Sequence, residues 1–142
     1  MSRQAKDLRQ LAELARLVSD RDLAELAAIA AARQGAEARR RGLIEGLAEA
    51  RVRVVAGVVR GADDDSAPGV VASEPAAARV AGFATLDRHT VAVMRGLTRT
   101  EEDIARLTEA WQARRQVAAR SFGRVSALAE IAREAAGGAR RS

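Results

Sequence analysis

The side chains that could support catalysis or metal binding are few and isolated. His89 is the only histidine, and Ala92 and Val93, its neighbours at helical spacing, offer neither a second ligand nor a proton carrier. The aspartates at 63–65 lack the alternating ligands and closing glutamate of a calcium loop. The chain has no cysteine and no glycine-rich phosphate loop. We therefore expect no catalytic, cofactor-binding or metal-binding residue and no enzymatic activity.

Arginine supplies 23 of the 24 positive charges, so an interaction with phosphate must be considered. Residues 1–60 carry 12 basic and 8 acidic groups, and residues 79–142 carry 12 and 7. Residues 61–78 carry four acidic groups and no basic one. Because acids interleave with the arginines, a solvated or partner-facing helix surface is favoured over a nucleic-acid interface. Nucleic-acid binding is the weaker alternative, and it predicts a steep salt dependence.

The composition favours helices that are long rather than compactly folded. Hydrophobic residues make up 48% of the chain, but most are alanine, and aromatic residues make up only 2%. Strong helix formers dominate outside one short segment, which indicates an all-α coiled coil. No apolar run approaches the roughly 20 residues of a membrane span, and the first residues lack the apolar core of a signal peptide. We expect a cytoplasmic protein that does not insert directly into a membrane.

The first arm is predicted to be a helix over about residues 5–58. An apolar seam with two arginines in it, Arg33 and Arg40, runs from Leu26 to Val54. A second strip (Leu8, Leu11, Ala15 and Val18) precedes it and drifts in phase at 19–22, where the helix either continues or restarts. The β-branched run at 52–59 is also compatible with a strand, but no partner strand is evident elsewhere in the sequence, so a fraying helix end is favoured.

The segment "GADDDSAPGVVASEPAA" predicts a loop over about residues 61–75, with Ser73, Glu74 and Pro75 starting a second helix over about 76–136. Taking Phe83 as heptad position a, apolar or small residues recur at a and d over seven heptads. The phase persists across "TRTEED" at 98–103, which favours one unbroken helix. Across both arms, the residues expected to pack in the seam are Leu26, Leu47, Leu97, Ile104, Leu107, Trp111, Val125 and Leu128.

Each arm alone would leave an apolar stripe in water, so the predicted fold is a single domain, 1–142, formed by a long antiparallel two-helix coiled-coil hairpin. A turn near residue 68 makes facing residue numbers sum to about 136, which places Trp111 near Glu25 and Leu26. We interpret Trp111 and Phe122 as packing anchors. Two alternatives stay open: a four-helix bundle broken at Ser19 and Thr98, and recruitment of a second copy by leftover leucines (Leu14, Leu17 and Leu23).

A helix, a mid-chain loop and a longer helix in this order resemble the FliJ/YscO family of type III export proteins. The local matches are "AEARRRGLIEGLAEA" at 36–50, "FATLDRH" at 83–89 and "LTEAWQARRQVAARSFGRVSAL" at 107–128. A Phe-x-x-Leu, a later Ala-Trp and a closing Ala-Leu recur in similar order in that family. This sequence departs from it at Gly46 and Ala50, where enterobacterial members show aromatic residues.

The resemblance implies a stalk and chaperone of the flagellar or injectisome export apparatus, located in the cytoplasm or peripherally at the inner membrane. Its paired termini would insert into the hexameric export ATPase and regulate it, and its loop-proximal half would dock on the cytoplasmic domain of the export gate and on export chaperones. The implied gate-facing residues are Leu43, Gly46, Ala50, Phe83, Thr90 and Met94. The implied ATPase-facing tip is basic and comprises Arg3, Lys6, Arg9 and Arg133.

A second hypothesis requires no export machinery. A generic coiled-coil adaptor or chaperone could bind a partner helix in an open groove between the two arms. The sequence does not separate this role from the export stalk.

Overall fold

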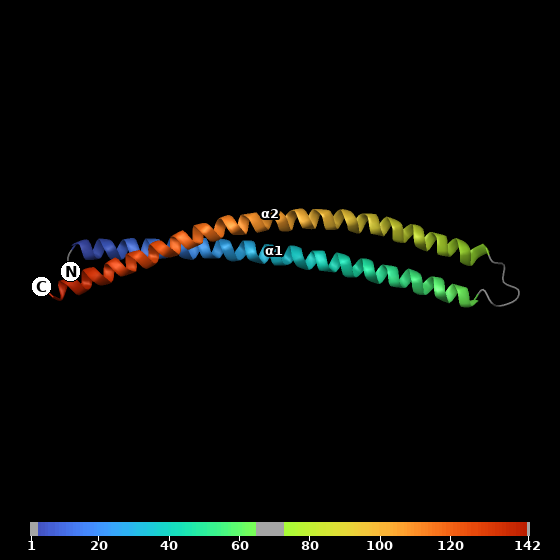
Figure 1. The fold of residues 1–142 in the computed structure, drawn as a ribbon, viewed down its shortest axis with the longest axis horizontal. Helices are drawn as coiled ribbons and strands as arrows, with labels where there is room; N and C mark the ends of the chain where they lie inside the picture. Colours follow the sequence, from blue (N-terminus) through green and yellow to red (C-terminus); the bar gives the residue numbers. More distant parts are fainter. Residues whose placement is uncertain (1–2, 65–72, 142) are drawn as a thin grey trace. The chain divides into compact units, whose positions relative to one another are not determined.

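The computed structural model describes residues 3–64 and 73–141. They form two α-helices that pack against each other, α1 (Arg3–Asp64) and α2 (Ser73–Ala139), as Figure 1 shows. Within these ranges there is no β-strand. The all-helical prediction is therefore confirmed.

Both helices are continuous through the positions at which the sequence allowed a break. α1 passes through Ser19 and the β-branched run at 52–59, and α2 passes through Thr98. The hydroxyls of Thr90 and Thr100 donate to backbone carbonyls four residues earlier, each at 2.8 Å, so they need no partner outside the helix. The four-helix alternative, which required breaks at Ser19 and Thr98, is excluded.

The helices extend further than the sequence predicted. α1 ends at Asp64 instead of near residue 58, and α2 begins at Ser73 instead of near 76 and ends at Ala139 instead of near 136. Proline is tolerated in a first helical turn, where its missing N–H has no intrahelical acceptor, so Pro75 does not delay the start of α2. The outer parts of the predicted loop are thus helical. Residues 65–72, the rest of that loop, lie outside the described residues.

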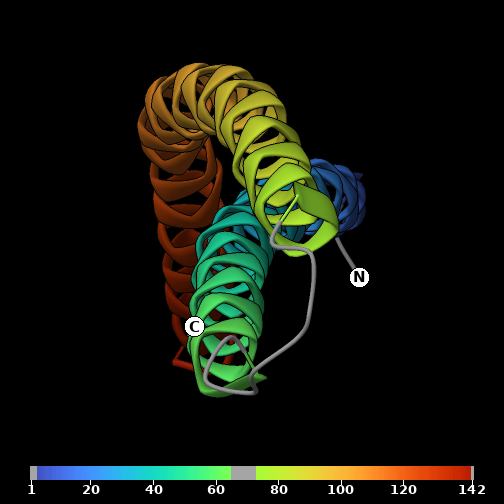
Figure 2. The same cartoon turned by 90° about the vertical axis from the view of Figure 1, so that its right-hand side faces the viewer.

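The helix contacts divide the chain into two units. Unit 1 comprises residues 1–34 and 105–142, and unit 2 comprises residues 35–104. Each helix contributes one segment to each unit. Figure 2 views unit 2 from the end at which α1 finishes and α2 begins.

In unit 1 the inward positions of α1 follow one heptad phase without interruption. Ser19 and Asp22 are buried, and Leu8, Ala12 and Ala15 precede them as half-buried residues in steps of three and four. The two remaining residues of the strip predicted here, Leu11 and Val18, are each 51% exposed. The predicted strip is therefore right at Leu8 and Ala15 and wrong by one position at Leu11 and Val18. The phase does not drift at residues 19–22, because polar side chains occupy the inward positions there.

The α2 seam matches the predicted heptads over most of its length. In unit 1, Ala118 and Ser121 are buried, and in unit 2, Val93 and Thr100 are buried. Near the start of α2, however, Gly82 is half-buried while Phe83 is 50% exposed. The predicted a position at Phe83 is wrong, because the inward face at this level is formed by the glycine that precedes it.

In each unit, the contacts pair a later residue of α1 with an earlier residue of α2. In unit 1, Asp22 contacts Ser121 and Glu25 contacts Arg114. In unit 2, Arg40 contacts Glu101, and Leu43 lies against Gly96. The residue numbers of these pairs sum to between 139 and 143. The sequence predicted about 136, so each residue faces a partner three to seven positions further along the other helix.

Candidate functional site

The candidate sites among the described residues lie at the surfaces of the two units. Within residues 3–64 and 73–141, no group of three or more histidine, cysteine, aspartate or glutamate side chains is placed to hold a metal ion. His89 is exposed on α2. No helix in this part of the chain is long and apolar enough to cross a membrane.

Trp111 lies half-buried on the seam of unit 1, beside a cluster of charged residues. The guanidinium of Arg115 stacks over its ring at 5.4 Å from the centroid, a cation–π contact. One turn away, Arg114 Nη1 lies 2.8 Å from Glu25 Oε2, and Arg21 Nε lies 3.2 Å from Glu25 Oε1. Glu25 therefore binds one arginine on each helix.

The two predicted packing rings thus have different environments. Trp111 is half-buried, whereas Phe122 is 61% exposed. The interpretation of Phe122 as a packing anchor is wrong, since position 122 lies one step beyond the buried Ser121 and points away from the seam. Phe122 is part of the surface of unit 1.

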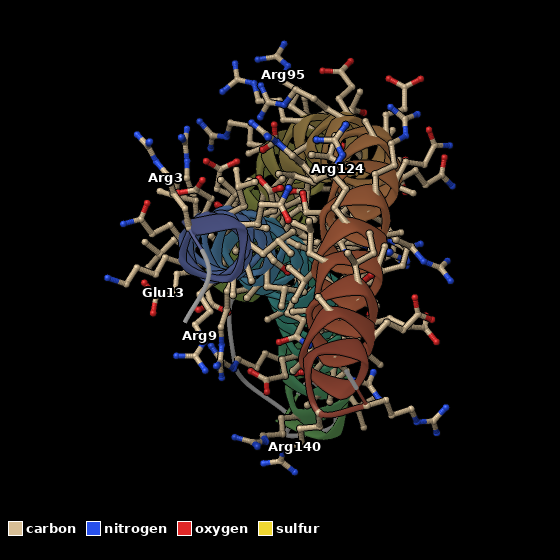
Figure 3. All side chains as sticks on the ribbon, turned by 90° about the vertical axis from the view of Figure 1, so that its left-hand side faces the viewer. Arg3, Arg9, Glu13, Arg95, Arg124 and Arg140 are labelled. Carbon is tan, nitrogen blue, oxygen red and sulfur yellow. The ribbon has the colours of Figure 1, made fainter. Side chains whose placement is uncertain are left out.

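The residues predicted to contact the ATPase all belong to unit 1 and are exposed. Arg3, Lys6 and Arg9 occupy the first turns of α1, and Arg133 lies near the end of α2. Figure 3 shows the side chains of Arg3 and Arg9 projecting from α1 into solvent, with Glu13 on the next turn. The tip carries basic side chains on both helices, and exposed acidic side chains lie among them, Asp7 and Glu13 on α1 and Glu130 and Glu134 on α2.

Unit 2 contains a groove of about 640 Å³ along one side of its seam. Small residues from both helices line it, including Gly46 and Ala50 on α1 and Ala81 and Gly82 on α2. The remaining lining residues are Glu49, Arg53, Val54, Thr85, Leu86 and His89.

The six residues predicted to face the export gate all lie in unit 2, but they do not form one surface. Gly46 and Ala50 line the groove, while Leu43 and Thr90 are half-buried on the seam. Phe83 and Met94 are exposed and do not line the groove. The candidate set therefore divides between the groove, the seam and surface outside the groove.

The predicted seam residues are all at least half-buried. Leu47 is the most enclosed, at 9% exposure. The other seven are half-buried and comprise Leu26, Leu97, Ile104, Leu107, Trp111, Val125 and Leu128.

Sequence reasoning missed the groove, although its signal was present. Gly46 and Gly82 occupy positions where a side chain would otherwise cover the seam, and an added Cβ at either would meet nothing within 4 Å. In a chain this rich in alanine, glycine costs helix stability of about 1 kcal/mol, so paired glycines mark an opening.

Comparison with known proteins adds no relative to this description. A scan against protein-family models finds no match, and searches of curated proteins and of solved structures find no significant similarity.

Proposed function

We propose that this protein is a non-catalytic helical stalk of a type III export apparatus, as its resemblance to the FliJ/YscO family suggests. In this proposal α1 and α2 form one antiparallel coiled-coil hairpin. Unit 1, which contains the start of α1 and the end of α2, inserts into the hexameric export ATPase, and unit 2 faces the cytoplasmic domain of the export gate and the export chaperones. The chain resides in the cytoplasm, or at the inner membrane through these partners.

The observation that carries the proposal is the difference in exposed side chains between the two units. Unit 1 combines the start of α1 and the end of α2 with exposed basic residues, including Lys6 and Arg133. Unit 2 combines an open groove with exposed apolar side chains such as Phe83 and Met94. A basic tip suits an acidic socket, and an open groove with apolar residues nearby suits a protein partner.

The coupling role follows from the mechanics of helices. Because every backbone N–H and C=O in a helix interior is paired, a helix transmits displacement along its axis better than a loop does. A tip bound in the ring would bias the nucleotide cycle there, and the other unit would convey that state to the gate.

The test measures ring binding and ATP turnover with the export ATPase from the same organism. We expect the chain to co-sediment with the ring and raise its turnover, and Lys6→Glu with Arg133→Glu to abolish both effects. Arg88→Glu with Arg95→Glu, a matched charge reversal in unit 2, should leave both intact. Absence of ring association and unchanged turnover with the native chain would refute the stalk role.

The groove of unit 2 specifically favours a second candidate, a coiled-coil adaptor or chaperone that binds a partner helix. Gly46→Leu would place a large side chain in the groove, since an added Cβ at this position meets nothing within 4 Å. Under the adaptor role, neither the native chain nor the Gly46→Leu variant changes the ATP turnover of the ring. Only the native chain binds the partner helix. Under the stalk role ring stimulation is present and survives Gly46→Leu.

A further inference from the structure

One side of unit 2 carries large apolar side chains on both helices. We define the apolar face as six such residues, which are between 46% and 69% exposed. They are Ile44 and Val55 on α1 and Val80, Phe83, Val91 and Met94 on α2. Leaving them in water within one short two-helix segment is unfavourable, because each side chain forgoes the transfer free energy of burial.

The apolar face lies on the side of the seam opposite the groove. Each of its residues directly follows a buried or half-buried residue of its own helix, as Met94 follows Val93. The groove instead includes residues that directly precede inward positions, such as Gly46 before the buried Leu47. Between antiparallel helices, the residues that follow inward positions flank one side of the seam, and those that precede them flank the other.

Two unpaired charges of opposite sign lie among these apolar residues. Arg51 follows the half-buried Ala50 on α1, and Asp87 follows the half-buried Leu86 on α2. Neither has an opposite charge three or four residues away on its own helix. Within residues 3–64 and 73–141, no ion pair involves either of them. A partner that sets an acidic group against Arg51 and a basic group against Asp87 would gain at both, and a second copy of the chain provides both groups.

We propose that the apolar face binds the same face of a second copy, related by a two-fold axis parallel to the helices of unit 2. This rotation places α1 of one copy against α2 of the other, twice, as antiparallel neighbours. It moves no residue along the helix axes. The register within unit 2, set by Arg40 with Glu101 and by Leu43 with Gly96, therefore also holds between the copies.

This register makes the two copies complementary along the middle of the face. Ile44 faces Met94 of the second copy, and Arg51 faces Asp87 of the second copy. Both pairs depart by only one residue, about 1.5 Å, from the register of the contact at Gly96. Apolar side chains therefore meet apolar side chains, and the two unpaired charges meet each other.

The end of the face carries a charge network. Arg41 approaches Glu101 of the second copy, and Glu101 already lies 3.6 Å from Arg40 of its own chain. Glu37 also approaches Glu101, which is the one like-charged approach in this arrangement. The two arginines beside this carboxylate pair offset its repulsion.

The available area suits a dimer of moderate affinity. The face covers about 22 residues of each helix, which span roughly 33 Å, and two helices are roughly 20 Å wide, so each copy offers about 650 Å². Two faces total about 1,300 Å², near the lower end of stable interfaces. We expect a dissociation constant in the micromolar range. The proposal concerns the free chain and goes beyond both the stalk role and the adaptor role.

The first test exchanges the charges at Arg51 and Asp87 and measures mass by sedimentation equilibrium between about 1 and 200 μM. The native chain should approach twice the monomer mass of 15.1 kDa. Arg51→Asp alone and Asp87→Arg alone should each weaken self-association by about tenfold, because like charges then meet twice between the copies. An equal mixture of the two variants should recover association, since the mixed dimer pairs opposite charges at both contacts. Within either variant chain the two positions carry like charges in every sample, so recovery can arise only between copies.

The second test removes apolar contacts. Val55→Gln with Val91→Gln, which changes one valine on each helix of the face, should weaken association by about tenfold or more. The matched control, Val18→Gln with Val117→Gln, also changes one exposed valine on each helix but lies in unit 1, and it should weaken association less than about twofold. Circular dichroism at 222 nm checks that each variant is as helical as the native chain, and glutamine is tolerated because its helix propensity is high.

A monomer at every concentration would overturn the proposal. So would a mixture of the charge variants that associates no better than either variant alone, because the two-fold arrangement requires recovery. Equal weakening by the unit 1 control would also overturn it. These measurements use the chain without any export protein, so their failure is distinct from a failure of the ring assay.

Discussion

Ser121 on α2 donates a hydrogen bond to the buried carboxylate of Asp22 on α1, which lies 99 residues earlier in the chain. The Val117 carbonyl lies 3.1 Å from the same hydroxyl, but a hydroxyl has one proton to donate. The bond to Asp22 is the one that joins the helices. A polar pair at this point in an otherwise apolar seam favours a single register, since any slip would leave the carboxylate buried against apolar groups.

Removing the hydroxyl should therefore cost more than removing both polar groups. We expect Ser121→Ala to destabilise the fold by about 1–3 kcal/mol, because it leaves a buried carboxylate without its donor. Asp22→Leu combined with Ser121→Ala should recover most of that loss. Urea unfolding monitored at 222 nm measures both. A double variant as unstable as Ser121→Ala would show that the pair contributes more to stability than the mutual hydrogen bonding of its two polar groups.

This pair also marks the limit of sequence reasoning. Heptads of α2 were readable because Leu97, Ile104 and Trp111 are apolar at inward positions. On α1 the same phase passes through Ser19 and Asp22, which look like surface residues, while Leu11 and Val18 look like core. Asp22 can occupy an inward position because Ser121 on the other helix donates a hydrogen bond to its carboxylate. A local sequence pattern cannot reveal a partner that lies 99 residues away.

The positions of the rings show a second limit. Phe83 fits position a by spacing, yet Gly82 faces inward beside it. Spacing fixes a residue's angle on an ideal helix but not whether the partner helix covers that residue. An added Cβ at Gly82 would meet nothing within 4 Å, and Phe83 beside it is 50% exposed. The helix bounds were underestimated for a different reason. Aspartate and proline were interpreted as loop formers, although both are compatible with terminal helical turns.

The ion pair between Glu25 and Arg114 should contribute modestly and depend on salt. Their side chains are 32% and 44% exposed, so solvent screens the attraction. A double-mutant cycle with Glu25→Gln and Arg114→Gln should give a coupling free energy of about 0.5–1 kcal/mol at low salt. The coupling should fall at 1 M salt, where the Debye length is about 3 Å. A coupling that is unchanged by salt would indicate a packing contact instead.

Replacing leucine by alanine should distinguish seam positions from surface positions by the loss in free energy of unfolding. Leu47 is buried on α1, so Leu47→Ala should cost about 2–4 kcal/mol through lost burial and a residual cavity. Leu17→Ala, at an exposed position of the same helix, should change the free energy of unfolding by less than about 0.5 kcal/mol. Thermal and urea unfolding give both values. Equal effects at the two positions would contradict the assigned heptad phase.

Glycine replacement should test how closely the helices approach in unit 2. At Gly123 an added Cβ meets nothing within 4 Å, so Gly123→Ala should stabilise the chain by up to about 1 kcal/mol through helix propensity alone. At Gly96 the same Cβ would lie 3.3 Å from Leu43 Cδ1 and 3.6 Å from its Cδ2. The leucine must then rotate or the helices must separate, so Gly96→Ala should gain less than Gly123→Ala or lose stability. Combining Gly96→Ala with Leu43→Ala relieves the contact, and the cost of Leu43→Ala should be smaller in the Gly96→Ala background than in the native chain. If Gly96→Ala instead stabilised as much as Gly123→Ala, α2 would not approach Leu43 as closely as the structure places it.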